Sequence, residues 1–170
     1  MKKIVFALLL MVSAVAVHAQ RYAVIDTKYI LNKLPEYKDA DKKIQQISEQ
    51  WQKEIDTKQA ELDKMYKDYD AEQVMLSDEL KKKREAELFA KEKEVRELQK
   101  KRFGYDGDVF KERQRLIKPI QDKVYTAIQK IAVAKGYDFV LDKSEGITVI
   151  FADPKLDKSD DVLREMGIQL

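Results

Sequence analysis

The sequence predicts an α+β protein in which a long antiparallel α-helical hairpin of the coiled-coil type is inserted into a small β body. The first observation is that residues 35–135 are rich in charge and carry apolar residues at heptad-like spacing, which indicates helix. The second is that β-strand patterns flank this region, Tyr22–Asp26 before it and Tyr137–Leu141 and Ile147–Phe151 after it. Because both ends return to one small sheet, the helix must double back on itself.

The first nineteen residues, 1–19, read as a secretory signal peptide. Lys2 and Lys3 precede an apolar run, and the small residues around Ala19 give the pattern of a cleavage site. The apolar run is shorter than the ~20 residues that a helix needs to cross a bilayer. We therefore expect cleavage and export to the periplasm in preference to an uncleaved membrane anchor.

The remaining chain divides into a body and an arm. Residues 20–34 and 136–170 are expected to form a small β-rich oligomerisation body, because the strand patterns lie there. Residues 35–135 form the helical arm, with its tip near 74–78. A body this small, with open strand edges, rarely stabilises itself alone, so we expect a homo-oligomer.

The composition argues against most catalytic chemistry. The sequence has no cysteine, and its one histidine, His18, lies in the predicted signal peptide. The mature chain therefore lacks the residues that dominate zinc sites, thiol nucleophiles and proton transfer near neutral pH. A carboxylate-only enzyme would need an apolar pocket-forming segment, and none accompanies the acids. We expect no enzymatic activity, no cofactor and no metal site.

Charge is distributed unevenly along the predicted hairpin. Residues Glu36–Gln73 contain 11 acidic and 7 basic residues, whereas Glu79–Arg102 contains 6 acidic and 10 basic residues. Opposite net charges on successive segments suit antiparallel pairing. Exposed ion pairs are each worth only ~0.2–1 kcal/mol, so this pattern sets register more than stability.

The outgoing arm carries an apolar seam with steps of three and four residues. Its members are Ile44, Ile47, Trp51, Ile55, Leu62, Met65 and Tyr69. Lys58 occupies a position where the spacing places a seam residue, and one step is inserted after Trp51, a stutter that relaxes the supercoil. The seam favours a paired hairpin over a solvated single helix, because an isolated charged helix has little to hold it in place.

The returning arm contains helix-weakening residues. Gly104 and Gly107 lie three apart in a helical pattern, and each costs ~1 kcal/mol relative to alanine. Pro119 should kink the helix by removing a hydrogen bond. All three residues are candidate hinge positions, and a merely tolerated kink is the alternative. If the glycines form a hinge, alanine at both positions should stiffen the arm.

Two groups of residues near the tip are candidates for contact with other molecules. The apolar group consists of Met65, Tyr66, Tyr69, Val74, Met75 and Leu76. The basic group consists of Lys81, Lys82, Lys83 and Arg84. The alternative is that the apolar residues only close the seam and that the basic run is a solvated face paired with acids of the other arm. The sequence contains no pattern of aromatic and basic residues that would form a groove for nucleic acid, so nucleic-acid binding is disfavoured.

The order of features resembles the Skp (OmpH-like) periplasmic chaperones of Gram-negative bacteria along essentially the whole mature chain. The resemblance is carried by Ala23–Asp26, Tyr29–Leu31, the charged hairpin and Tyr137–Asp142. It implies a homotrimer with a barrel-like β core and helical arms that hold unfolded outer-membrane proteins without ATP. The mature chain departs from the basic character of the family, because it is formally neutral once Lys2 and Lys3 are removed.

Two classes of function follow from these features. The leading hypothesis is a periplasmic holdase, with contact between the basic run and a membrane surface or lipid as an additional role. The rival is a structural coiled-coil spacer or adaptor of the cell envelope with one defined partner. A glycine-rich phosphate loop is absent from the sequence, consistent with ATP-independent action.

Overall fold

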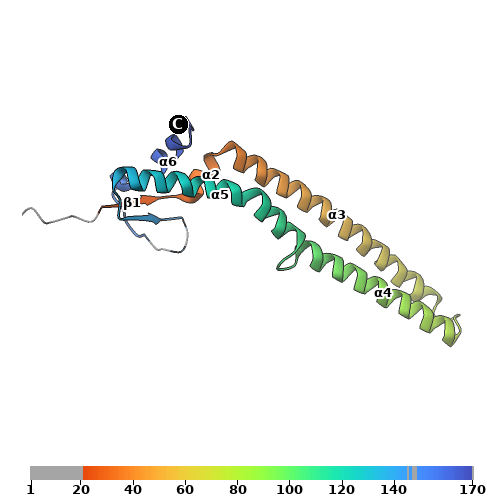
Figure 1. Ribbon diagram of the computed structural model, residues 1–170. Helices are drawn as coiled ribbons and strands as arrows, with labels where there is room; N and C mark the ends of the chain where they lie inside the picture. Colours follow the sequence, from red (N-terminus) through yellow and green to blue (C-terminus); the bar gives the residue numbers. More distant parts are fainter. Residues whose placement is uncertain (1–20, 145, 147–148, 170) are drawn as a thin grey trace, which may run out of the picture. The chain divides into compact units, whose positions relative to one another are not determined.

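The computed structural model describes residues 21–144, 146 and 149–169, most of which are helical (Figure 1). The elements are β1 (Tyr22–Ile25), α2 (Thr27–Lys33), α3 (Pro35–Glu72), α4 (Asp78–Phe103), α5 (Asp108–Lys135), β2 (Phe139–Asp142), η2 (Pro154–Leu156) and α6 (Ser159–Glu165). The predicted signal peptide lies outside the described residues. The long helical hairpin and the small sheet that the sequence predicts are both present.

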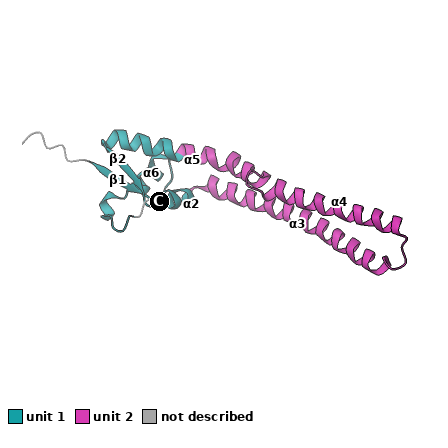
Figure 2. Cartoon of the chain, turned by 90° about the horizontal axis from the view of Figure 1, so that it is seen from below, with its two compact units in different colours: residues 1–33, 124–170 teal, residues 34–123 magenta. Residues whose placement is uncertain are grey.

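The chain forms two compact units, coloured separately in Figure 2. The second unit runs from Leu34 to Lys123, and the first consists of the chain on either side of it. Helix α5 contributes to both units, because its C-terminal part from Val124 onward belongs to the first. We expected the body to resume only at residue 136. Val124 and Ala127 are buried, which gives this part of α5 an apolar face within the first unit.

The first unit is built on two strands that pair in parallel. Tyr22 lies opposite Phe139, and the register continues to Ile25 opposite Asp142. Two helices, α2 and α6, pack together and complete its core, and Ile30 and Leu163 are fully buried there. The strands predicted near Tyr22 and near Phe139 are therefore confirmed.

The third predicted strand, over residues 147–151, is wrong for the part that the structure describes. Val149–Phe151 has no regular secondary structure, and Ile147 and Thr148 lie outside the described residues. One edge of β1 pairs with β2, and its other edge forms an isolated bridge from Val24 to Asp157. β-Branched residues favour a strand, but this propensity is a weak signal that is realised only where the segment pairs with a neighbouring strand.

Asp142, at the end of β2, fastens this strand to the start of α2. Its carboxylate accepts hydrogen bonds from the backbone N–H of Thr27 at 3.2 Å and of Ser144 at 2.9 Å, and from both of their hydroxyl groups. Burial acts to raise the pKa of Asp142, but these hydrogen bonds outweigh burial and hold the pKa below its usual value.

The second unit pairs α3 with α4 as antiparallel neighbours, seen in magenta in Figure 2. Pro35 occupies the first turn of α3, as predicted, because its missing N–H has no helical partner there. Residues 73–77 connect the helices, and Ser77 caps α4 by accepting a hydrogen bond from the N–H of Leu80 at 3.4 Å. Leu62, Leu88 and Val95 form a buried cluster between the two helices.

The predicted weak point is a complete interruption of the returning helix. Helix α4 ends at Phe103 and α5 begins at Asp108, so Gly104 and Gly107 bound the break. The loop is compact, because the N–H of Gly107 donates to the carbonyl of Gly104 at 2.9 Å. In contrast, α5 continues through Pro119, whose missing N–H removes one helical hydrogen bond.

The expectation that alanine at both glycines would stiffen the arm needs correction. A Cβ atom at Gly104 would lie 2.3 Å from the carbonyl oxygen of Lys100, and one at Gly107 would lie 2.8 Å from that of Arg102. Both neighbours are backbone atoms, so the clash cannot be relieved by a side-chain rotation. Alanine at either position should therefore displace the loop from its present conformation.

We predict that Asp142→Asn destabilises the first unit in a pH-dependent manner. The folded-state pKa is lowered, so the carboxylate contributes stability that is fully present above the unfolded pKa of about 3.9 and is lost as the pH falls through the folded pKa. At pH 7 the variant should be less stable by about 1–2 kcal/mol, and this difference should shrink below about pH 4. Urea unfolding followed at several pH values measures it.

Asp41→Asn is the matched control, because Asp41 is exposed on α3. It should leave the free energy of unfolding nearly unchanged. An Asp142→Asn variant whose stability deficit stayed constant between pH 7 and pH 3 would contradict the assignment.

Candidate functional site

The described part of the chain carries neither a metal-ligand cluster nor a helix that could cross a membrane. No group of three or more histidine, cysteine, aspartate or glutamate side chains there could hold a metal ion. None of the described helices has both the length and the apolar character needed to cross a membrane. All the contact residues that the sequence singled out lie in the second unit.

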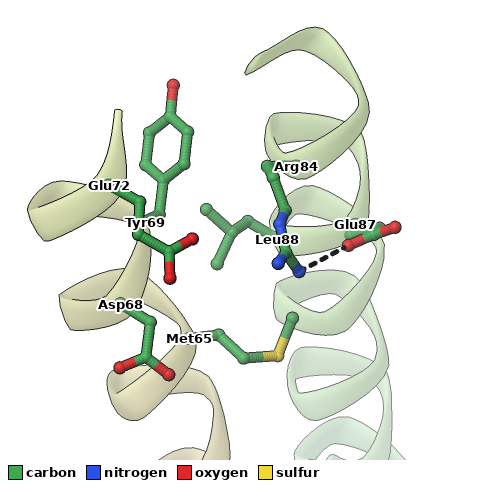
Figure 3. Close-up of a pocket in the computed structure, with 7 residues that line it drawn as sticks. All are labelled: Met65, Asp68, Tyr69, Glu72, Arg84, Glu87 and Leu88. Carbon is green, nitrogen blue, oxygen red and sulfur yellow. Dashed lines mark hydrogen bonds and ion pairs between the residues drawn. The ribbon is translucent and has the colours of Figure 1, made fainter. Parts of the chain in front are cut away.

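Met65 and Tyr69 belong to the hairpin seam. Both pack against the cluster of Leu62, Leu88 and Val95, and the hydroxyl of Tyr69 donates to Glu85 across the hairpin at 2.6 Å. They leave a pocket of about 110 Å³ between α3 and α4, shown in Figure 3. It is lined by Met65, Asp68, Tyr69, Glu72, Arg84, Glu87 and Leu88. A pocket of this size can hold a few water molecules but is too small for a folded protein segment.

The connection between α3 and α4 carries the most exposed apolar side chains of the candidate group. Val74 is 87% exposed and Met75 is 82% exposed, whereas Leu76 is partly buried. Tyr66 is exposed on α3, and its hydroxyl lies 3.4 Å from Glu92 of α4. Val74 and Met75 therefore contribute nothing to the seam and are free to contact another molecule.

The basic run lies on the first turns of α4. Lys81 is partly buried, and the next three residues are exposed. Arg84 pairs with Glu87 of its own helix at 3.4 Å, and Figure 3 shows this pair beside the pocket. Lys82 and Lys83 form no ion pair with any described residue. The run thus makes little use of the acids on the outgoing helix.

Ion pairs between the two arms lie further from the connection. Lys91 pairs with Glu61 at 3.3 Å, and Arg102 pairs with Glu54 at 3.0 Å, so bases of the returning arm meet acids of the outgoing arm. Lys123 and Glu36 form a similar pair at 2.6 Å. The opposite net charges of the two arms therefore produce ion pairs that fix how α3 aligns with the returning arm.

Lys58 fills the seam position that its spacing predicts. Its ammonium group lies 2.6 Å from Glu94, and the pair interrupts an otherwise apolar line between Ile55 and Leu62. Glu94 has a second partner in Lys91, at 3.4 Å. The hydrogen bond to Glu94 raises the pKa of Lys58 above its usual value.

Sequence reasoning missed several residues that the structure makes prominent. Phe89 and Tyr105 are strongly exposed aromatics, and Arg102 is a hub of contacts beside the helix break. Phe89 could have been found, because it follows the seam residue Leu88 by one position and must point away from the partner helix. Arg102 could not, because its contact with Glu54 depends on the pairing of α3 with α4 and its contact with Asp108 on the conformation of the loop that follows it.

The first unit has one depression of about 330 Å³ that merits consideration. It is lined by Asp26, Tyr29, Lys143, Pro154, Asp157, Ser159 and Asp160. Its polar side chains already satisfy one another: Lys143 pairs with Asp157 at 2.7 Å, and Tyr29 donates to Asp160 at 3.1 Å. These contacts hold the end of β2 and the start of α6 in place, so we assign the depression a structural role.

The fold and its surfaces thus define a helical-hairpin protein with contact surfaces and no identifiable catalytic centre in the described residues. Residues 21–166 match the family model described as outer membrane protein (OmpH-like), so the chain belongs to the OmpH-like family.

The crystal structure of a candidate outer membrane chaperone (OmpH-like) from Caulobacter crescentus CB15 has the same fold. It superposes with a TM-score of 0.68 at 20% sequence identity, covering 88% of this chain and 86% of that one. No curated protein is detectably similar to the chain in sequence.

We predict that Lys58→Leu stabilises the hairpin. Leucine would complete the apolar seam between Ile55 and Leu62, and Glu94 would keep Lys91 as a partner, so no buried charge is left alone. The midpoint of thermal unfolding, followed by circular dichroism at 222 nm, should rise by a few degrees. Lys53→Leu, at an exposed position of the same helix, should give no such rise. A lower midpoint for Lys58→Leu would show that the ion pair itself stabilises the seam.

Proposed function

We propose that the chain is a periplasmic, ATP-independent holdase chaperone that binds unfolded outer-membrane proteins. The observation that carries the proposal is membership of the OmpH-like family across residues 21–166. The chaperone description of the similar Caulobacter crescentus protein supports it. Export would follow cleavage of the predicted signal peptide, residues 1–19.

Binding would rest on many weak contacts along the hairpin. Val74 and Met75 offer exposed apolar surface, and methionine is suited to adaptable, non-specific contact. Lys82 and Lys83 add unpaired positive charge nearby, which would attract acidic segments of a client. Such contacts release and re-form easily, so a client can be held and transferred without nucleotide hydrolysis.

The chain would work as a homotrimer whose bodies, residues 20–34 and 136–170, share a barrel-like β core. The first unit exposes apolar side chains that do not stabilise a monomer. They include Phe139, Ile150, which is 94% exposed, and Phe151, which is 83% exposed. Val149–Phe151 has strand-forming residues that pair with no strand among the described residues. Pairing with another subunit would supply the partner, and the helical hairpins would then enclose a client cavity.

The break between α4 and α5 would let the hairpins adapt to clients of different size. Gly104 and Gly107 bound the break, and Pro119 weakens α5 further along the same arm. A joint made of short loop backbone can absorb changes in φ and ψ that a continuous helix cannot.

A structural spacer or adaptor of the envelope is the second candidate function. The pairs of Lys91 with Glu61 and Lys123 with Glu36 favour it, because a hairpin fastened at intervals suits a spacer. A spacer would bind one native partner saturably and would ignore unfolded chains, which separates it from a holdase.

We predict that the mature protein suppresses aggregation of a β-barrel membrane protein diluted from urea, at a stoichiometric amount of trimer and without nucleotide. Val74→Ser/Met75→Ser should require roughly threefold or more protein for half-maximal suppression, because about 1 kcal/mol or less of apolar contact is lost per side chain. Light scattering measures the effect.

Ala60→Ser/Ala90→Ser is the matched control, since both alanines are exposed, one on each of the helices α3 and α4 that the connection joins. It should behave as the wild type. Complete failure to suppress aggregation, with no complex detected, would reject the holdase function. Suppression that the tip variant leaves unchanged would reject only the role of Val74 and Met75.

We predict that native mass spectrometry of the mature protein finds a trimer, and a trimer with one client after addition of an unfolded β-barrel protein. Ile150→Asp/Phe151→Asp should shift the distribution to monomer, because charge at these positions opposes strand addition. Val74→Asp/Met75→Asp, in the other unit, is the control and should remain trimeric. A monomeric wild type at micromolar concentration would contradict the proposed assembly.

A further inference from the structure

Arg102 ties three helices together at the break in the returning arm. Its side chain is 20% exposed and lies in the last turn of α4. One guanidinium nitrogen, Nη2, donates to Glu54 of α3 at 3.0 Å, and the other, Nη1, donates to Asp108 at the start of α5 at 2.7 Å. The guanidinium carbon also lies 4.7 Å from the centre of the Trp51 ring on α3.

The break faces the irregular step of the outgoing seam. On α3 the inserted step follows Trp51, and Arg102 contacts both Trp51 and the neighbouring Glu54. On the returning side the helix stops immediately after Arg102, at Phe103, and restarts at Asp108. A stutter changes the phase of a seam, and an interrupted partner can restore the match because its two halves rotate independently.

We propose that Arg102 acts as a latch, by which we mean that its contacts hold the break between α4 and α5 in its present conformation, the closed state. The three contacts are with Trp51, Glu54 and Asp108. While the latch is closed, the start of α5 is fixed against α3 through one planar cation. When it is open, residues 103–107 become a flexible connection and Trp51 loses its cover. This goes beyond the hinge proposal, because it names the contacts that control whether the hinge moves.

The chemistry of the site requires arginine at this position. The guanidinium group can donate to two carboxylates from different nitrogens and still present its flat face to an aromatic ring, whereas the ammonium of lysine is a point charge that cannot do all three. The Nε atom of Arg102 is buried without a hydrogen-bond partner. An unpaired buried donor is unfavourable, so the closed state is less stable than its contacts alone would make it.

The glycines belong to the closed state. Gly107 is buried, and a Cβ atom there would lie 2.9 Å from both the nitrogen and the oxygen of Gly104. The loop must keep this close backbone packing for Asp108 to reach Arg102. Gly107→Ala should therefore open the latch, the opposite of the stiffening that a simple hinge would show.

Hydrogen exchange and tryptophan fluorescence together test the latch. Three amides report on the break: the N–H of Gly104 donates to Lys100, that of Gly107 to Gly104, and that of Lys111 to Gly107. Trp51 is the one tryptophan of the sequence, so its emission reports on the stacked guanidinium. The variants are Arg102→Gln, Arg102→Lys and Asp108→Asn, with Arg96→Gln as control for loss of an arginine from the same helix.

Arg102→Gln and Asp108→Asn should accelerate exchange at the three amides by about tenfold, which corresponds to about 1.4 kcal/mol. Arg102→Gln should also shift Trp51 emission to longer wavelength, Asp108→Asn should shift it less, and Arg102→Lys should not restore the wild-type spectrum. Arg96→Gln should change neither readout, since Arg96 pairs only with Glu92 of its own helix among the described residues.

Unchanged exchange in both Arg102→Gln and Asp108→Asn would overturn the latch. If Arg102→Gln accelerates exchange along the whole hairpin, the Asp108→Asn variant distinguishes a general loss of stability from opening of the latch. Faster exchange confined to residues 103–111 in that variant supports the latch, and unchanged exchange there overturns it. Slower exchange in Gly107→Ala would also overturn it. None of these outcomes depends on chaperone activity, so failure of the latch and failure of the proposed function are separable.

Discussion

The parallel pairing of β1 with β2 is the constraint on which the rest of the fold depends. Tyr22 and Phe139 are neighbours in the sheet, although the entire helical region separates them in the chain. Parallel strands cannot be joined by a tight turn. The intervening helices must therefore bring the chain back to where it started, and an antiparallel hairpin does this with one reversal, at residues 73–77.

The long helical hairpin is held together by a seam that is only partly apolar. Leu62, Leu88 and Val95 supply a buried cluster, but Lys58 stands in the same line and the inter-arm ion pairs remain partly exposed. Exposed pairs contribute little free energy, and their value lies in selecting one register. The hairpin therefore has a defined alignment without a deep core, and this is compatible with the binding and movement that we propose for its exposed side chains and its break.

The sequence was informative where structure follows from local pattern. Heptad spacing predicted the two arms, and Pro35 and Ser77 marked helix starts because capping depends on neighbouring residues. Prediction failed for residues 149–151, because strand propensity is a weak signal that is realised only where the segment pairs with a neighbouring strand, and that pairing cannot be read from the local pattern. It also missed Arg102, because its contact with Glu54 joins segments far apart in the chain and its contact with Asp108 depends on the conformation of the loop between α4 and α5.

The two glycines show how local and distant information combine. From the sequence alone they read as a weak point, since glycine lowers helix stability wherever it occurs. The structure adds that the backbone around Gly107 packs too closely for any side chain. A residue needed for close packing stabilises one particular geometry of the break, while its conformational freedom favours others. On the latch proposal, the break is a joint with a preferred closed state, and the guanidinium of Arg102 is placed where that preference can be set.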